Sequence, residues 1–161
     1  MKISKGRGWP AGVVVLALSL LTAPALAGWG PETPPFNLEA ILRPAAGVPD
    51  GFGLVKFRQP NDATKIVYLD TWVRDLTPSH DYYLQRATDA NVDDDCRGTN
   101  WLTLGRITTD GGGTGREALS RDLAAVALGM KFDIQFRIVE TPIATAPAVL
   151  ESACYQFVVS Q

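Results

Sequence analysis

The sequence predicts an all-β domain, an antiparallel β-sandwich of about eight strands held together by one disulfide. Two patterns lead to this expectation. Apolar and polar residues alternate with a period of two in segment after segment, while the period of an amphipathic helix does not recur. Turn-forming residues separate these segments about every ten residues, which is typical of an antiparallel sandwich or a small barrel.

The first half of the chain contains four predicted strands. Residues 36–43 alternate and end before Pro44, which lacks the N–H that a strand ladder needs. Residues 65–73 are largely apolar on both faces, which indicates a central strand. The other two predicted strands are residues 52–58 and 82–88, each bounded by turn-forming residues.

The second half begins with a predicted hairpin. Residues 101–108 and 116–122 flank the glycine-rich segment 110–115, which is typical of a tight connection. Residues 131–140 alternate cleanly, and the face expected to point inward consists of Phe132, Ile134, Phe136 and Ile138. The face expected to point outward consists of Asp133, Gln135, Arg137 and Val139.

The last predicted strand, residues 148–160, places Cys154 on the same face as Leu150 and Val158. One helical candidate remains, the Ala-rich stretch 119–128 that Gly129 ends. We interpret it as the end of a strand followed by a turn or a short helix. Residues 36–161 are therefore expected to form one domain.

The N-terminal residues 1–27 have the organisation of a cleavable signal peptide. Residues 2–7 contain three cations, and residues 11–21 form an apolar stretch too short to span a bilayer as a helix. Ala25-Leu26-Ala27 then offers the small-x-small pattern of a cleavage site. The mature protein would begin with a Pro/Gly-rich leader, residues 28–35, and would be periplasmic or secreted, with no membrane insertion after cleavage. An uncleaved membrane anchor is the alternative.

The charge of the mature chain restricts its partners. Removing residues 1–27, which carry three basic and no acidic side chains, leaves 12 basic against 17 acidic side chains in 134 residues, a net charge of −5. This mildly acidic balance argues against a nucleic-acid partner and against binding to a membrane surface through a polybasic segment. A protein or a glycan is the expected type of partner.

Cys96 and Cys154 both lie in the mature part of the chain. In an exported protein with two thiols, a disulfide between them is the default expectation. It would close a loop of roughly 58 residues and stabilise the fold by about 4 kcal/mol in the chain-entropy model. A reactive thiol is the alternative, although no histidine lies nearby in the sequence.

The segment from Val73 to Tyr82 contains the run Leu76-x-Pro78-x-x-x-Tyr82. It resembles the corner between two strands in fibronectin type III and related immunoglobulin-like domains. The resemblance covers about ten residues and implies an immunoglobulin-like sandwich in which Tyr82 buries its ring and hydrogen-bonds back across the corner. It implies nothing about activity, because fold does not determine function.

One loop has the spacing of a calcium site. Oxygen-bearing side chains fall at alternate positions: Asp89, Asn91, Asp93 and Asp95. Two positions depart from the usual calcium loop, because Asp94 stands where glycine is expected and Asn100 where a bidentate glutamate is expected. A solvated acidic turn is the alternative interpretation.

No catalytic constellation stands out. His80 is the sole histidine, so a histidine-rich zinc site cannot form, and its place in a probable turn indicates an exposed side chain. Neither a nucleophile elbow nor a phosphate-binding loop is present. Four glutamates lie on predicted strands and are the candidate acids of a small glycosidase: Glu39, Glu117, Glu140 and Glu151.

Five aromatic side chains are candidates to line a sugar- or peptide-binding face, although their alternation with aliphatic residues favours packing: Tyr68, Trp72, Tyr83, Trp101 and Tyr155. The sequence as a whole predicts an exported, non-enzymatic binding or envelope-associated module without a cofactor. The alternatives are a calcium-stabilised adhesion or carbohydrate-binding domain and a small secreted hydrolase.

Overall fold

The computed structural model describes residues 37–60 and 64–159. The predicted signal peptide, the leader and Phe36 lie outside the described residues. Within the described part, no helix is long and apolar enough to cross a membrane. The strands are β1 (Asn37–Pro44), β2 (Phe52–Arg58), β3 (Ile66–Arg74), β4 (Asp81–Asp89), β5 (Leu102–Thr108), β6 (Gly115–Asp122), β7 (Lys131–Val139), β8 (Ala148–Ser152) and β9 (Tyr155–Val158).

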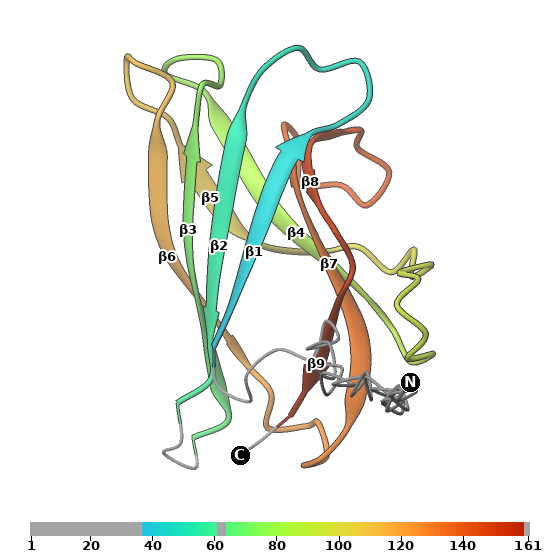
Figure 1. The fold of residues 1–161 in the computed structure, drawn as a ribbon. Helices are drawn as coiled ribbons and strands as arrows, with labels where there is room; N and C mark the ends of the chain where they lie inside the picture. The colour runs from blue at the N-terminus through green and yellow to red at the C-terminus, as the bar shows by residue number, and fades with distance from the viewer. Residues whose placement is uncertain (1–36, 61–63, 160–161) are drawn as a thin grey trace, which may run out of the picture.

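All the strands belong to one continuous antiparallel sheet. Its order is β5-β4-β7-β8-β1-β2-β3-β6, and β9 pairs with β7. The sheet curls until its two end strands, β5 and β6, lie beside each other, as Figure 1 shows. They share no backbone ladder. Side chains close the seam instead, because Leu119 of β6 covers Gly105 of β5 so closely that a Cβ at this glycine would overlap it.

The fold is thus all-β and antiparallel, as predicted, and nearly barrel-shaped. The expected immunoglobulin-like sandwich is not confirmed, because the strands form one curled sheet and not two stacked ones. The physical reason is that period-two alternation reports only that each strand has a buried face. A sandwich and a barrel both satisfy that condition, and the pairing of distant strands chooses between them.

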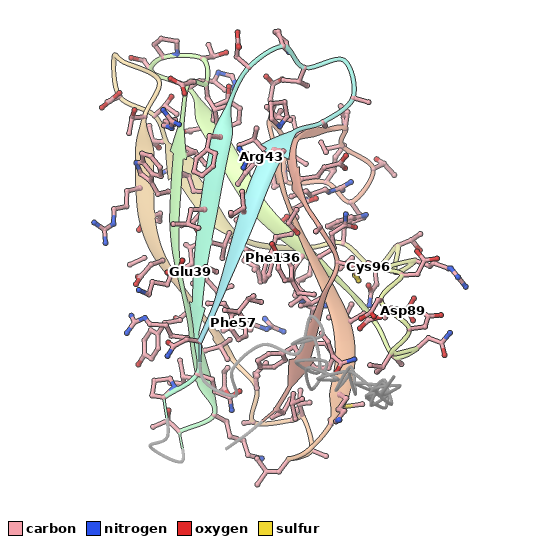
Figure 2. All side chains as sticks on the ribbon, viewed as in Figure 1. Glu39, Arg43, Phe57, Asp89, Cys96 and Phe136 are labelled. Carbon is pink, nitrogen blue, oxygen red and sulfur yellow. A yellow bond between two sulfur atoms is a disulfide. The ribbon has the colours of Figure 1, made fainter. Side chains whose placement is uncertain are left out.

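The core fills the interior of the barrel. Inward-facing residues alternate along the strands, for example Val55 and Phe57 on β2 and Phe136 on β7, all of them buried. Phe57 packs edge-on against Phe157 of β9, with ring centroids 4.6 Å apart, and lies 6.3 Å from the ring of Phe136. Figure 2 shows Phe57 and Phe136 between the facing strands. These aromatic contacts join β2, β7 and β9 across the barrel.

The outer face of β7 differs from the prediction. Asp133, Arg137 and Val139, expected to point to solvent, are buried. The segments 90–101 and 141–146 lie over this face, because Asp133 accepts hydrogen bonds from the first and Arg137 donates one to the second. Alternation along a strand cannot anticipate cover that comes from connecting loops.

The last predicted strand is divided into β8 and β9. The break falls at Ala153 and Cys154, and it reverses which face of the strand points inward. Phe157 is buried, whereas Val158, predicted to share a face with Leu150, is only half-buried. The break leaves β9 paired with β7 alone. The Ala-rich stretch 119–128 is the end of β6 followed by turns, as interpreted from the sequence.

The corner between β3 and β4 has the geometry that its sequence predicts. Tyr82 is 1% exposed, and its hydroxyl accepts a hydrogen bond from the Thr77 amide at 3.2 Å. The glycine-rich turn docks on this corner, because the Ser79 amide donates to the Asp110 carbonyl at 2.9 Å. Gly113 adopts φ +76° with its α-carbon against the backbone of Leu76, so no side chain fits there. The glycine-rich segment is therefore an architectural turn.

Candidate functional site

A cavity of about 210 Å³ lies inside the barrel at the end that carries the β6–β7 connection. Its wall is mainly apolar, and the apolar side chains come from five strands and the adjoining loops: Phe57, Val67, Leu69, Ala90, Leu104, Leu123, Val126, Met130, Phe132, Ile134, Phe136 and Phe157. Small barrels have an interior just wide enough for side chains or one small ligand. A concave apolar space with few polar groups is the usual form of a ligand site.

Three polar side chains complete the wall, namely Arg86 and Thr88 of β4 and Arg121 of β6. Arg86 and Thr88 continue the inward-facing row of Tyr82 and Leu84, so β4 directs a cation into the barrel. The Arg86 guanidinium donates to the Thr88 hydroxyl at 3.0 Å. Arg121 is exposed, so the cavity reaches the surface beside β6.

The two guanidinium groups lack anionic partners. Within residues 37–60 and 64–159, neither Arg86 nor Arg121 takes part in an ion pair. Burial, and next the positive charge of Arg121, lower the pKa of Arg86. The cavity therefore combines apolar walls with two arginines that form no ion pair among the described residues.

Sequence reasoning missed these two arginines, although a signal was present. In residues 82–88 the even positions are Tyr, Leu, Arg and Thr, so Arg86 occupies a place in the inward-facing row. Arg121 follows Leu119 two residues later on β6 and shares its face. An arginine in the apolar row of a strand is unusual enough to mark a site.

The acidic loop does not gather its oxygen atoms. The Asp89 carboxylate accepts hydrogen bonds from the amides of Asn91 (3.0 Å) and Arg97 (3.3 Å). Asp93 accepts one from the Asp95 amide at 3.2 Å, and the Asn91 side chain donates to its other oxygen at the same distance. The Arg97 guanidinium binds Asp95 at 2.7 Å. Figure 2 places Asp89 beside the labelled Cys96 on this outer loop.

Among the described residues, no three His, Cys, Asp or Glu side chains group together in a way that would hold a metal ion. The calcium site at Asp89, Asn91, Asp93 and Asp95 stays a prediction. What the structure adds is Asp133, a fully buried carboxylate beneath the loop. Its Oδ2 accepts from the amides of Asp93 (3.0 Å) and Asp94 (2.9 Å), and its Oδ1 has no hydrogen-bond partner in the part of the chain that the structure describes.

The disulfide between Cys96 and Cys154 is confirmed, with the two Cα atoms 5.4 Å apart. It ties the acidic loop to the break between β8 and β9. In a separate cluster, the Arg137 guanidinium lies 3.9 Å from the ring centroid of Trp101 and donates to the Gln85 side chain at 2.7 and 2.9 Å. Burial lowers the pKa of Arg137. Through these contacts Arg137 holds the segments that cover β7, and Trp101 is one of its contacts.

Of the remaining sequence candidates, His80 and Glu140 lie close to each other. The Nε2 atom of His80 lies 4.0 Å from a carboxylate oxygen of Glu140, and the His80 ring contacts that of Tyr82 at 4.9 Å. Glu39 pairs with Lys56 at 3.6 Å on the outer face of the barrel. Glu117 and Glu151 are exposed on β6 and β8.

The five aromatic candidates lie in different parts of the structure. Tyr68 and Trp72 lie on the outer face of β3, where Trp72 contacts Phe52 edge-on at 5.8 Å. The Tyr155 hydroxyl accepts a hydrogen bond from the Ile41 amide at 3.2 Å, which bridges β9 and β1. Tyr83, on β4, is half-buried. These side chains do not form one common binding face.

Comparison with known proteins finds no family model that matches this chain and no curated protein with significant similarity to it.

Proposed function

We propose that this chain is an exported, non-enzymatic binding protein that holds a small, largely apolar ligand inside the open end of its barrel. The observation that carries the proposal is the cavity of about 210 Å³, whose wall is made almost entirely of aliphatic and aromatic side chains. Transfer of apolar surface from water into such a space is favourable. Export is supported by the disulfide, which persists in oxidising compartments, and by the N-terminal sequence pattern.

A neutral apolar probe that matches the cavity in size tests the proposal without involving the arginines. Toluene has seven carbon atoms and no charge, and titration calorimetry detects its binding. We expect saturable binding to the folded protein. The Val126→Phe variant should weaken it strongly, because this side chain lines the cavity and a larger one would narrow the space.

Leu128→Phe is the matched control. Leu128 lies in the same β6–β7 connection, is 59% exposed and does not line the cavity. Toluene binding should survive in this variant. Equal affinity of both variants for toluene would place it on the surface and refute the proposed site, provided that thermal unfolding shows both variants to be folded.

A relationship to fibronectin type III and immunoglobulin-like domains is a separate proposal. Its support is the corner alone, where the Tyr82 hydroxyl accepts from the Thr77 amide. The single curled sheet does not favour it. An experimental structure tests it directly, since two stacked sheets would support the relationship and a continuous barrel ladder would argue against it.

A further inference from the structure

The proposed cavity has a polar side with a specific chemistry. Arg86 and Arg121 reach it from β4 and β6, two strands that are not adjacent in the sheet. Arg86 is half-buried on the inner face of the barrel, and Arg121 is exposed where the cavity reaches solvent. The two cations therefore lie at successive depths along the same opening.

Such an arrangement is unfavourable by itself. A buried cation is usually paired with an acidic group, because removing its charge from water costs free energy. The Arg86 guanidinium donates a hydrogen bond to the neutral Thr88 hydroxyl, and within residues 37–60 and 64–159 no carboxylate forms an ion pair with it or with Arg121. Two like charges that share an apolar wall also repel each other. An anion between them would remove both costs.

The apolar part of the cavity limits the size of the ligand. An apolar cavity of about 150 Å³ holds one benzene molecule, which has six carbon atoms. By this comparison, a volume of about 210 Å³ accommodates about eight carbon atoms. Three aromatic rings, Phe57, Phe136 and Phe157, lie in the wall among aliphatic side chains from facing strands.

We infer that the cavity selects a small amphiphile with a carboxylate head, the head held by Arg86 and Arg121 and an apolar part of about seven carbons lying among the apolar walls. This inference rests on the proposed function and names the ligand class of the same site. Arginine suits the head group because its planar fork matches the two oxygens of a carboxylate.

Titration calorimetry with two probes of equal chain length tests it. Octanoate carries the carboxylate, and 1-octanol is its neutral counterpart. We expect octanoate to bind at least about tenfold more tightly than 1-octanol, since hydrogen bonds to charged groups are the stronger ones. In the Arg121→Gln variant this difference should shrink to about threefold or less, while 1-octanol affinity stays unchanged.

Arg116→Gln is the matched control, because Arg116 lies exposed on the same strand, pairs in register with Trp72 on the outer face and does not line the cavity. It should leave both affinities unaltered. Equal affinity of the wild-type protein for octanoate and 1-octanol would overturn the carboxylate inference and leave the apolar site standing. Failure of both probes to bind would overturn the apolar site as well.

Discussion

At the scale of single residues, Tyr82 contributes a hydrogen bond that can be removed without disturbing the core. The Tyr82→Phe variant keeps the buried ring but loses the hydroxyl that accepts from the Thr77 amide. We expect the free energy of unfolding to fall by about 1 kcal/mol, the usual contribution of one such bond. Chemical denaturation measures the change, and Tyr83→Phe on the neighbouring half-buried ring is the control. Equal effects of the two substitutions would contradict a specific role for the corner.

Asp110 makes the stability of the glycine-rich turn depend on pH. The amides of Thr114 and Gly112 donate to its carboxylate at 3.0 and 2.8 Å and lower its pKa below the ordinary value of 3.8. As pH falls, the unfolded carboxyl group takes up its proton before the folded one does. The stabilisation by the charge is therefore complete above the ordinary pKa and is lost as pH falls through the folded pKa.

The Asp110→Asn variant isolates this effect, because its amide oxygen can still accept the backbone hydrogen bonds. We expect the difference in unfolding free energy between wild type and variant to be constant above about pH 5 and to shrink toward zero in stronger acid. Urea denaturation across this range measures it. A difference that does not change with pH would show that the charge of Asp110 contributes nothing to the turn.

At the scale of elements, strand positions could be predicted closely and loop cover could not. Residues 52–58 are β2 in the structure as in the prediction, because period-two alternation and flanking turn residues are local signals. The burial of Arg137 and Asp133 depends on two loops distant in sequence, so no local pattern contains it. Arg86 could be predicted only in part. Its inward position follows from the alternation along the strand, whereas its lack of an acidic partner among the described residues does not.

A buried carboxylate, Asp133, anchors the acidic loop. We expect Asp133→Ala to lower the free energy of unfolding by about 2 kcal/mol, because it leaves the Asp93 and Asp94 amides without their acceptor.

The melting temperature of the wild type, measured with calcium and then with chelator, distinguishes the two interpretations of the loop. A solvated turn, in which the carboxylates accept from backbone amides and Arg97, predicts no change with calcium. A calcium-dependent rise that chelator reverses and Asp93→Ala abolishes would instead establish the calcium site.

At the scale of the whole molecule, the barrel is closed by several different means. Backbone ladders join the strands from β5 through to β6, whereas the seam between these two end strands depends on Leu119 covering Gly105. On the opposite side, β9 pairs with β7 but not with β1. A hydrogen bond from the Ile41 amide of β1 to the Tyr155 hydroxyl of β9 connects β1 and β9 instead. The cavity occupies the end of the barrel where closure depends most on side chains.

The disulfide restrains this same end. Cys96 belongs to the loop that begins beside Ala90, and Cys154 precedes β9, which carries Phe157; Ala90 and Phe157 both line the cavity. Replacing both cysteines by serine should lower the free energy of unfolding by about 4 kcal/mol, because a cross-link between residues 58 apart restricts the unfolded chain.

Loss of the disulfide should also weaken binding of toluene at temperatures where the serine variant is still folded, since two walls of the cavity would no longer be joined. Circular dichroism establishes the folded range, and titration calorimetry within it measures the affinity. Unchanged affinity in the folded serine variant would show that the disulfide stabilises the chain without shaping the cavity. Weakened affinity that Asp133→Ala does not reproduce would assign the effect to the cross-link itself, because that substitution loosens the same loop and keeps the disulfide.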